Sequence, residues 1–379
     1  MPPRPDREWP RPRQGLDHGA PPRGRRPRGG CSAALPRAPQ PPAPALQGPA
    51  VSAFEAWLPR LRELGDEVRR AVGEVQRSAS ASALSRPAGE GVGDVTFALD
   101  VVAERAVEAW LERRVDPLSL LSEDHGWRHR GGEDFDHGGP RIAIDPIDGT
   151  RPLMAGLRSA WVCIGLAPPG QGQPRLRDLS GGLLVELPLP GQRQRRTLWA
   201  ERGGPCWLER AEGEAAAAPQ ELRVDPDDRC DHGLFCFFHY HPRQRVDMAR
   251  IEQAFFARLE EHEGAELRAC YPDLYCSSAG QLALLALGTY RFQADLRAWL
   301  PGSEGAPLCK PYDLSGALVV AEAAGVVVHA PPAEGHATPP LDAPLDARTP
   351  LAFLGYANAP TAARLGPHLL AAIDAWRSS

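Results

Sequence analysis

Residues 142–150 read Ile-Ala-Ile-Asp-Pro-Ile-Asp-Gly-Thr. The apolar residues predict a short buried strand that ends at Asp145, after which a proline turns the chain toward a second acid, Asp148. Gly149 and Thr150 would then begin a helix, where free backbone N–H groups suit a phosphate. Two carboxylates three residues apart are typical ligands of a hard cation such as Mg²⁺. The alternative is an Asx turn between a strand and a helix, because Asp, Pro and Gly are common turn residues.

Other acidic segments flank this stretch in a fixed order. Asp94–Asp100 reads DVTFALD, Leu121–Gly126 reads LSEDHG, and Pro311–Ala317 reads PYDLSGA. Together with DPIDGT these segments resemble the motifs of the inositol monophosphatase family, which comprises metal-dependent sugar and polyol phosphatases and is related to fructose-1,6-bisphosphatase. The resemblance extends over about residues 55–360, and four acidic motifs in order are a far more specific signal than one hexapeptide.

The resemblance implies a set of metal ligands and a cofactor. Two or three Mg²⁺ ions would lie between protein carboxylates and the phosphate of the substrate. One ion would be held by Glu123, Asp145 and the backbone carbonyl of Ile147, and another by Asp145, Asp148 and Asp313. Asp145 would therefore contact both ions.

The same resemblance implies catalytic roles. A water activated by the metal would attack the phosphorus, Thr150 would orient that water, and Asp100 would accept the hydroxyl proton of Thr150. Glu123 would hold a second water. Asp100 has an alternative role as the N-terminal cap of the helix that follows it.

Four residues are expected to bind the substrate or its phosphate: Gly149, Thr150, Arg151 and Lys310. Arg151 departs from the family pattern, which has a polar residue and then an aromatic residue after the threonine. Ala306 stands seven residues before Asp313, where inositol-specific members have a glutamate that contacts a ring hydroxyl. We therefore expect a substrate with a second anionic group rather than inositol 1-phosphate. The alternatives to substrate binding are that Arg151 is an exposed surface residue and that Lys310 extends into solvent.

Charge and composition limit the classes of partner. The chain has 379 residues and a net charge of −5, but residues 1–50 contain nine arginines and three acids, so the remainder is near −11. An acidic body with a carboxylate site favours cations over nucleic acids. The chain has eight cysteines and no C-x-x-C pair, which predicts reduced thiols. It shows no apolar leader and no apolar run of membrane-spanning length, so we expect a cytoplasmic protein. We expect a small phosphorylated substrate as the partner, with a homodimer as an open possibility.

The pattern of elements predicts three regions. Residues 1–50, with 14 prolines, are expected to be a disordered tail. Residues 51–220 are expected to form an α+β metal-binding domain: helices at 51–77 and 101–114, a loop at 78–93, an exposed loop at 127–140, and an antiparallel sheet that includes strands at 141–145, 160–167, 181–187 and 196–201. A linker at 211–220 would lead to a smaller α/β domain at 221–379.

The strands and helices of this last region are expected to alternate. Strands are expected at 233–239, 266–271, 290–296, 325–329 and 351–356, and helices at 244–262, 278–288, 313–324 and 360–376. The resemblance implies a layered αβαβα sandwich for the whole. It also implies a Mg²⁺-dependent hydrolase of a phosphate monoester of inositol, sugar or nucleotide type. The competing hypothesis is a catalytically weak member of the family that acts as a regulatory protein associated with RNA or transcription.

Overall fold

A computed structural model describes residues 51–90, 95–213, 215–229, 233–264, 270–332 and 340–378. The predicted tail at 1–50 lies outside the described residues. Residues 51–379 form one compact unit. Within the described residues, no helix combines the length and the apolar composition that a membrane span requires.

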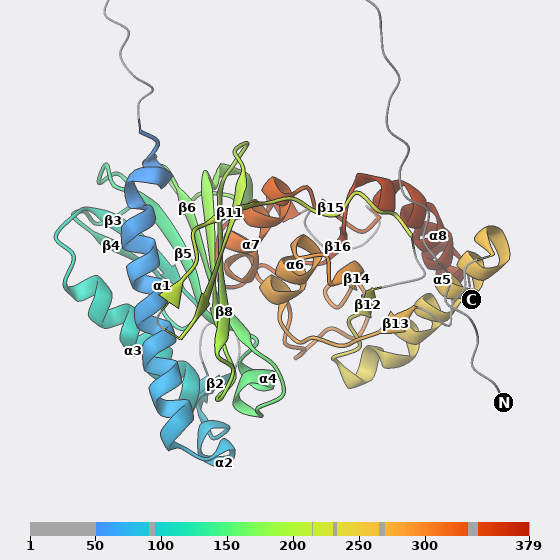
Figure 1. The fold of residues 1–379 in the computed structure, drawn as a ribbon, viewed down its shortest axis with the longest axis horizontal. Helices are drawn as coiled ribbons and strands as arrows, with labels where there is room; N and C mark the ends of the chain where they lie inside the picture. Colours follow the sequence, from blue (N-terminus) through green and yellow to red (C-terminus); the bar gives the residue numbers. More distant parts are fainter. Residues whose placement is uncertain are drawn as a thin grey trace, which may run out of the picture. The chain divides into compact units, whose positions relative to one another are not determined.

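A nine-stranded sheet forms the first half of this unit (Figure 1). All its strand pairs are antiparallel except the parallel pair β3–β5. The spatial order is β10-β9-β8-β7-β6-β5-β3-β4, with β11 also paired to β9. The strands are β3 (Leu118–Ser122), β4 (Gly126–Arg130), β5 (Arg141–Asp148), β6 (Ala160–Ala167), β7 (Gly181–Leu187), β8 (Gln194–Glu201), β9 (Cys206–Glu212), β10 (Ala215–Ala216) and β11 (Gln220–Leu222).

Helices cover both faces of this sheet. Helices α1 (Ala53–Ser78) and α3 (Ala98–Glu112) pack on one face, and α7 (Pro311–Ala324) packs on the other (Figure 1). The alternation of side chains along β5 explains this, because Ile142 and Ile144 join the core under α1 and α3 while Ala143 joins the core under α7. The central strands are therefore apolar on both faces.

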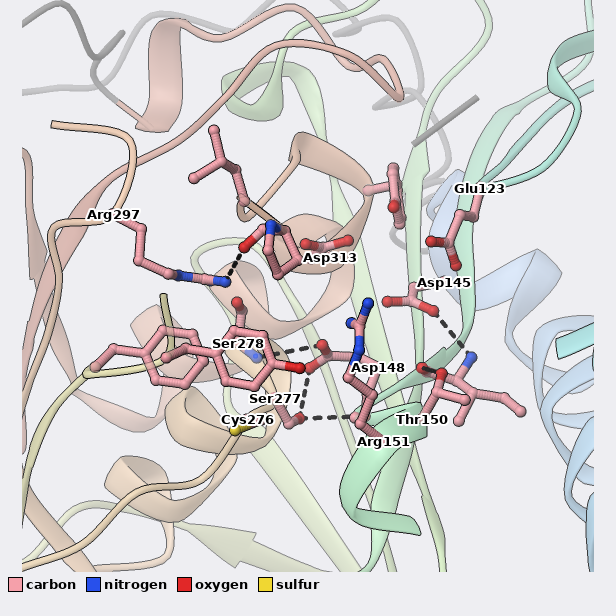
Figure 2. Close-up of a pocket in the computed structure, with 17 residues that line it drawn as sticks. Glu123, Asp145, Asp148, Thr150, Arg151, Cys276, Ser277, Ser278, Arg297 and Asp313 are labelled. Carbon is pink, nitrogen blue, oxygen red and sulfur yellow. Dashed lines mark hydrogen bonds between the residues drawn. The ribbon is translucent and has the colours of Figure 1, made fainter. Parts of the chain in front are cut away.

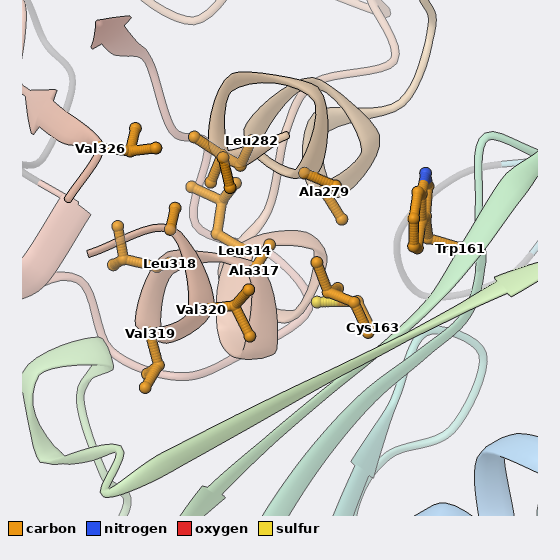
Figure 3. Close-up of a cluster of buried hydrophobic side chains, with 14 of the residues drawn as sticks. Trp161, Cys163, Ala279, Leu282, Leu314, Ala317, Leu318, Val319, Val320 and Val326 are labelled. Atoms are coloured by element: carbon orange, nitrogen blue, oxygen red, sulfur yellow. The ribbon is translucent and has the colours of Figure 1, made fainter. Parts of the chain in front are cut away.

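Helix α7 approaches the sheet closely. A Cβ atom added at Gly316 would lie 2.3 Å from the carbonyl oxygen of Ile164 in β6, so only glycine fits there. Leu314 and Ala317 of this helix, with Cys163 of β6, belong to one buried cluster, which also includes Leu282 of α6 (Ser278–Ala286) (Figure 3).

The second half contains a five-stranded sheet in the order β13-β12-β14-β16-β15. β12 is parallel to both β13 and β14, whereas β16 is antiparallel to its two neighbours. Helices α5 and α8 pack together and form one hydrophobic core with one face of this sheet. Helices α6 and α7 form a different hydrophobic core with its other face. The elements are β12 (Leu234–Phe237), α5 (Arg245–Glu263), β13 (Tyr271–Pro272), α6 (Ser278–Ala286), β14 (Tyr290–Asp295), β15 (Val327–His329), β16 (Phe353–Tyr356) and α8 (Ala359–Arg377).

The order of layers is therefore helices, large sheet, helices, small sheet, helices, which confirms the predicted αβαβα sandwich. Short elements complete the chain: α2 (Ala81–Leu84), β1 (Pro87–Glu90), β2 (Val95–Phe97), α4 (Thr150–Met154), and 3₁₀ turns at Leu176–Asp178, Pro242–Gln244 and Pro340–Asp342.

Several local predictions differ from the structure. The predicted loop at 127–140 begins with strand β4, which pairs with β3 across the turn at Glu123. The predicted loop at 78–93 contains α2 and β1, and the predicted linker at 211–220 contributes edge strands paired to β9. Most of the strand expected at 266–271 lies outside the described residues. The domain boundary near residue 220 stays a prediction, and α7 from beyond it packs on the large sheet.

Candidate active site

A cavity lies where the carboxyl end of β5 meets the first turns of α6 and α7 (Figure 2). Its lining is acidic at one end and contains arginine and aromatic side chains at the other. The lining residues are Glu123, Asp145, Ile147, Asp148, Gly149, Thr150, Arg151, Phe238, Tyr240, Cys276, Ser277, Ser278, Arg297, Pro307, Leu308, Tyr312 and Asp313.

The end of β5 places two acids in this cavity. The pairing of β5 with β6 is irregular between Asp145 and Asp148, and Asp145 Oδ1 accepts a hydrogen bond from the Ile147 N–H at 2.9 Å. The chain then passes through Gly149, whose φ of 102° favours glycine. The Asx turn considered from the sequence is therefore present, and both acids of the turn also line the cavity.

Thr150 and Asp100 are brought together from segments 50 residues apart. The Thr150 hydroxyl lies 2.8 Å from Asp100 Oδ1 and 2.9 Å from the carbonyl oxygen of Ile147. Asp100 Oδ2 also accepts a hydrogen bond from the Phe97 N–H at 2.8 Å, which caps the first turn of α3. The contact with Thr150 is the one expected from the family resemblance. Asp100 is not the N-terminal cap residue of the alternative, because α3 already begins at Ala98 and Asp100 bonds back to the cap residue Phe97 from inside the first turn. Asp100 does not itself line the cavity.

Glu123 comes from the turn between β3 and β4 and lines the cavity, as Tyr312 does. Burial raises the pKa of Glu123 well above its usual value, and the charges of Asp100 and Asp313 raise it further. Burial likewise raises the pKa of Asp145, with repulsion from Asp148, Glu123 and Asp313 acting in the same direction. These carboxylates are therefore close enough to repel one another.

Asp148 is tied to helix α6. Its Oδ2 accepts hydrogen bonds from the Ser277 hydroxyl at 2.6 Å and from the N–H groups of Ala279 and Gly280 at 2.5 and 3.3 Å, and its Oδ1 accepts from the Ser278 N–H at 3.2 Å. Burial raises the pKa of Asp148 to about 6, although these hydrogen bonds lower it. The acid thus fixes the position of α6 at the edge of the cavity.

Asp313 lies in the first turn of α7, where its Oδ2 accepts a hydrogen bond from the Lys310 N–H at 2.9 Å. Burial and repulsion from Asp148 raise the pKa of Asp313 to about 8. The side chain of Lys310 is not part of the lining, because its Nζ donates to the carbonyl of Arg348 at 3.3 Å. The geometry gives no support to Lys310 as a phosphate-binding residue.

Two arginines, Arg151 and Arg297, also line the cavity. The guanidinium of Arg151 lies 5.3 Å from the ring centroid of Phe97 and 5.7 Å from that of Tyr240, so Arg151 is not the isolated surface residue of the alternative interpretation. Arg297 lies 4.0 Å above the ring of Phe238. Ala306 is not among the lining residues, whereas the next two residues, Pro307 and Leu308, are.

Comparison with known proteins identifies the family. The family model described as "Inositol monophosphatase family" matches residues 60–363. The chain belongs to the inositol monophosphatase family. A search of curated proteins finds no match.

Solved structures of this type share the fold. A fructose-1,6-bisphosphatase from Leishmania major is 12% identical with a TM-score of 0.62, covering 86% of this chain and 96% of that one. An enzyme described as inositol monophosphatase-fructose 1,6 bisphosphatase is 14% identical with a TM-score of 0.58, covering 83% and 99%. The extragenic suppressor protein suhB from Bartonella henselae is 17% identical with a TM-score of 0.54, covering 83% and 98%.

The inositol monophosphatase family is generally metal-dependent, and the donor set of this member fits a hard divalent cation. Glu123, Asp145, Asp148 and Asp313 present carboxylate oxygens to one cavity, and burial raises the pKa of each, so a bound cation would favour their ionised forms. Among the described residues, no three acids, histidines or cysteines already stand at metal-binding spacing. Asp148 and Asp313 instead accept hydrogen bonds at the N-termini of α6 and α7.

Several residues of the cavity belong to no motif that the sequence of this family member displays. Phe238, Tyr240, Cys276, Ser277 and Arg297 come from segments after β12, before α6 and after β14, which lie far from the acidic motifs along the chain. Ser277 could have been found, because a serine before the apolar helix of 278–286 is a typical N-terminal cap. Nothing in the local sequence predicts that Arg297 lies in the cavity, because an arginine shortly after a buried strand can equally well lie at the surface.

Proposed function

We propose that this protein is a Mg²⁺-dependent phosphatase that hydrolyses a small phosphate monoester. The observation that supports this most is the convergence of Glu123, Asp145, Asp148 and Asp313 on one cavity beside Thr150. Burial raises the pKa values of these four acids, so their ionised forms are disfavoured unless a positive charge compensates them. They are suited to hold a divalent cation together with phosphate oxygens.

Glu123, Asp145, the carbonyl of Ile147, Asp148 and Asp313 would hold two or three ions. When bound, Mg²⁺ supplies the positive charge that stabilises the phosphate in its transition state and lowers the pKa of water. Hydrolysis of phosphate monoesters is among the slowest reactions without a catalyst, so stabilisation beyond roughly 20 kcal/mol is required.

The side chains around the ester would orient the reactants. Asp100, whose Oδ1 lies 2.8 Å from Thr150 Oγ1, would accept the single hydroxyl proton of Thr150. The lone pairs of Thr150 Oγ1 would then be available to accept a hydrogen bond from the attacking water. Burial raises the pKa of Asp100 to about 6, so at pH 7 and above it is mostly ionised and holds Thr150 in this orientation. Asp148 fixes α6, and α6 in turn forms one wall of the cavity.

The test is phosphate release from a panel of esters (inositol 1-phosphate, fructose 1,6-bisphosphate, histidinol phosphate and 3′-phosphoadenosine 5′-phosphate) with Mg²⁺ or with excess EDTA. We expect hydrolysis of at least one ester that requires Mg²⁺ and disappears in Asp145→Asn. Asp346→Asn is the matched control, because Asp346 also accepts a hydrogen bond from an N–H two residues later but does not line the cavity. Undiminished activity in EDTA would disprove the metal dependence.

A further inference from the structure

Arg297 is a buried cation at the edge of the cavity. It follows strand β14, its residue is 5% exposed, and it lines the cavity. Figure 2 shows it on the side opposite Glu123 and Thr150, with Asp148 and Arg151 between them. A substrate whose ester lies at the acidic end would therefore extend toward Arg297.

The guanidinium is held rigidly. Its Nε and one terminal nitrogen donate to the two oxygens of Asp295 at 2.8 and 2.5 Å, and its other terminal nitrogen donates to the carbonyl of Pro307. Asp295 is fully buried behind it, and the ring of Phe238 stacks on the guanidinium. Phe238 in turn stacks on Tyr240 with 5.7 Å between the ring centroids. Arg297 therefore cannot turn away from the cavity without breaking a buried ion pair.

Not all of its donors are engaged. A guanidinium has five N–H groups, and three of those of Arg297 bond to Asp295 and Pro307. The other two have no acceptor within the described part of the chain. Leaving donors of a buried charged group without partners is costly, and a buried ion pair is itself a weak source of stability. An acceptor supplied by a ligand would satisfy these groups.

The surroundings of Arg297 favour an anionic acceptor. Burial raises the pKa of the Cys276 thiol to about 11, but the charges of Arg297 and then Arg151 act in the opposite direction, so both guanidiniums lie near this residue. The N-terminal N–H groups of α6 are already bonded to Asp148. The two guanidiniums are thus the cationic donors that line the cavity in the described residues.

We propose that Arg297 is a specificity-determining residue that binds a second anionic group, a carboxylate or a phosphate, of the substrate. This inference rests on the proposed phosphatase function. A carboxylate or phosphate can accept two N–H groups of a guanidinium at once, which makes a stronger contact than a neutral hydroxyl can. Lys310, the second cation expected from the sequence, bonds elsewhere.

The experiment compares matched esters in the presence of Mg²⁺. Glycerol 1-phosphate and 3-phosphoglycerate differ by a carboxylate, and fructose 1-phosphate and fructose 1,6-bisphosphate differ by a phosphate. We expect the wild type to show at least tenfold higher kcat/KM for one of the bis-anionic esters than for its mono-anionic partner. Arg297→Gln should reduce this ratio by roughly 10- to 100-fold, mostly through KM, because charge-assisted hydrogen bonds are lost. Arg297→Lys should restore part of the ratio, since it keeps the charge but not the planar fork.

Arg196→Gln is the control for loss of a buried ion pair. Arg196 makes a two-point contact with the fully buried Glu186, outside the cavity, so this variant should lose stability and keep the ratio. If melting curves show that Arg297→Gln is not folded, Arg297→Lys decides: a ratio that stays at the wild-type value overturns the inference. Hydrolysis of all four esters with equal efficiency by the wild type also overturns it. Absence of hydrolysis of any ester would instead overturn the proposed function.

Discussion

The hydroxyl of Ser277 donates a hydrogen bond of 2.6 Å to Asp148, although 129 residues separate the two along the chain. The same hydroxyl accepts the Gly280 N–H at 2.9 Å and so caps helix α6. One side chain thus joins the acidic end of the large sheet to the helix that forms the opposite wall of the cavity. This contact couples the stability of α6 to the position of an expected metal ligand.

Ser277→Ala should lower both stability and activity. Loss of a helix cap typically costs about 1 kcal/mol, and here the same change also leaves Asp148 with one donor fewer. Ser52→Ala is the control, because Ser52 caps α1 through the Glu55 N–H but contacts no cavity acid. Urea unfolding should show a loss in both variants, whereas phosphatase assays should show a loss only in Ser277→Ala. Equal activity of the two variants would contradict the coupling.

Asp145→Asn should abolish activity without unfolding the protein. Asp145 is buried and repelled by three neighbouring acids, so removing its charge should leave the metal-free protein as stable as the wild type or more stable. Activity should fall by several orders of magnitude, because the neutral amide is a poor ligand for Mg²⁺. Initial rates and thermal melts in EDTA measure the two effects. A variant that keeps more than about a tenth of the wild-type rate, a loss under roughly 1.4 kcal/mol, would refute the role of Asp145 as the bridging ligand.

The metal-free protein should lose stability as the pH rises. The pKa values of Asp148 and Asp313 are raised to about 6 and about 8 in the folded state, so the folded state binds more protons than the unfolded state between about pH 4 and pH 8. The stability that these protonated acids allow is fully present below their pKa values in the unfolded state. It is therefore lost as the pH rises through their pKa values in the folded state.

Mg²⁺ should counteract this loss, because it binds the ionised carboxylates. Melting temperatures from pH 5 to pH 8, with EDTA or Mg²⁺, provide the measurement. The increase in melting temperature on adding Mg²⁺ should be larger at pH 8 than at pH 5. An increase of the same size at both pH values would show that these acids do not bind the cation.

Thr150→Val should lose most of the activity, while Thr150→Ser should retain it. Valine has nearly the shape of threonine but lacks the hydroxyl that lies 2.8 Å from Asp100. General acid–base and orienting groups typically contribute 10²- to 10⁴-fold to a rate, so we expect a loss in that range for kcat. Asp100→Asn should lower kcat in the same direction, because an amide can donate to Thr150 and disturb its orientation. Similar kcat values for Thr150→Val and wild type would remove Thr150 from the mechanism.

The local pattern of the sequence was sufficient to predict the strand and turn that carry Asp145 and Asp148, whereas Glu123 and Asp313 were expected from the family resemblance. The run from Ile142 to Thr150 alternates between two cores and ends in a turn, and that arrangement depends only on neighbouring residues. The strands at 160–167 and 181–187 were predicted with their observed bounds for the same reason. Strand β4 was missed because its half-buried residues, with charged and aromatic side chains, have no clear alternation and are ordered by pairing with β3.

The place of Arg297 in the cavity was decided by tertiary structure, whereas Arg151 was expected from its position after Thr150. Lys310 and Ala306 were assigned from their distance to Asp313 along the chain, yet the lysine bonds to Arg348 and the alanine lies outside the lining. Arg297 occupies the cavity because a buried aspartate two residues earlier and the ring of Phe238 hold it there. The spacing of residues along the chain predicts neighbouring ligands when a single turn carries them, as the turn with Asp145 and Asp148 does. A wall assembled from three separate segments depends on packing and on buried charge pairs, which only the folded chain brings together.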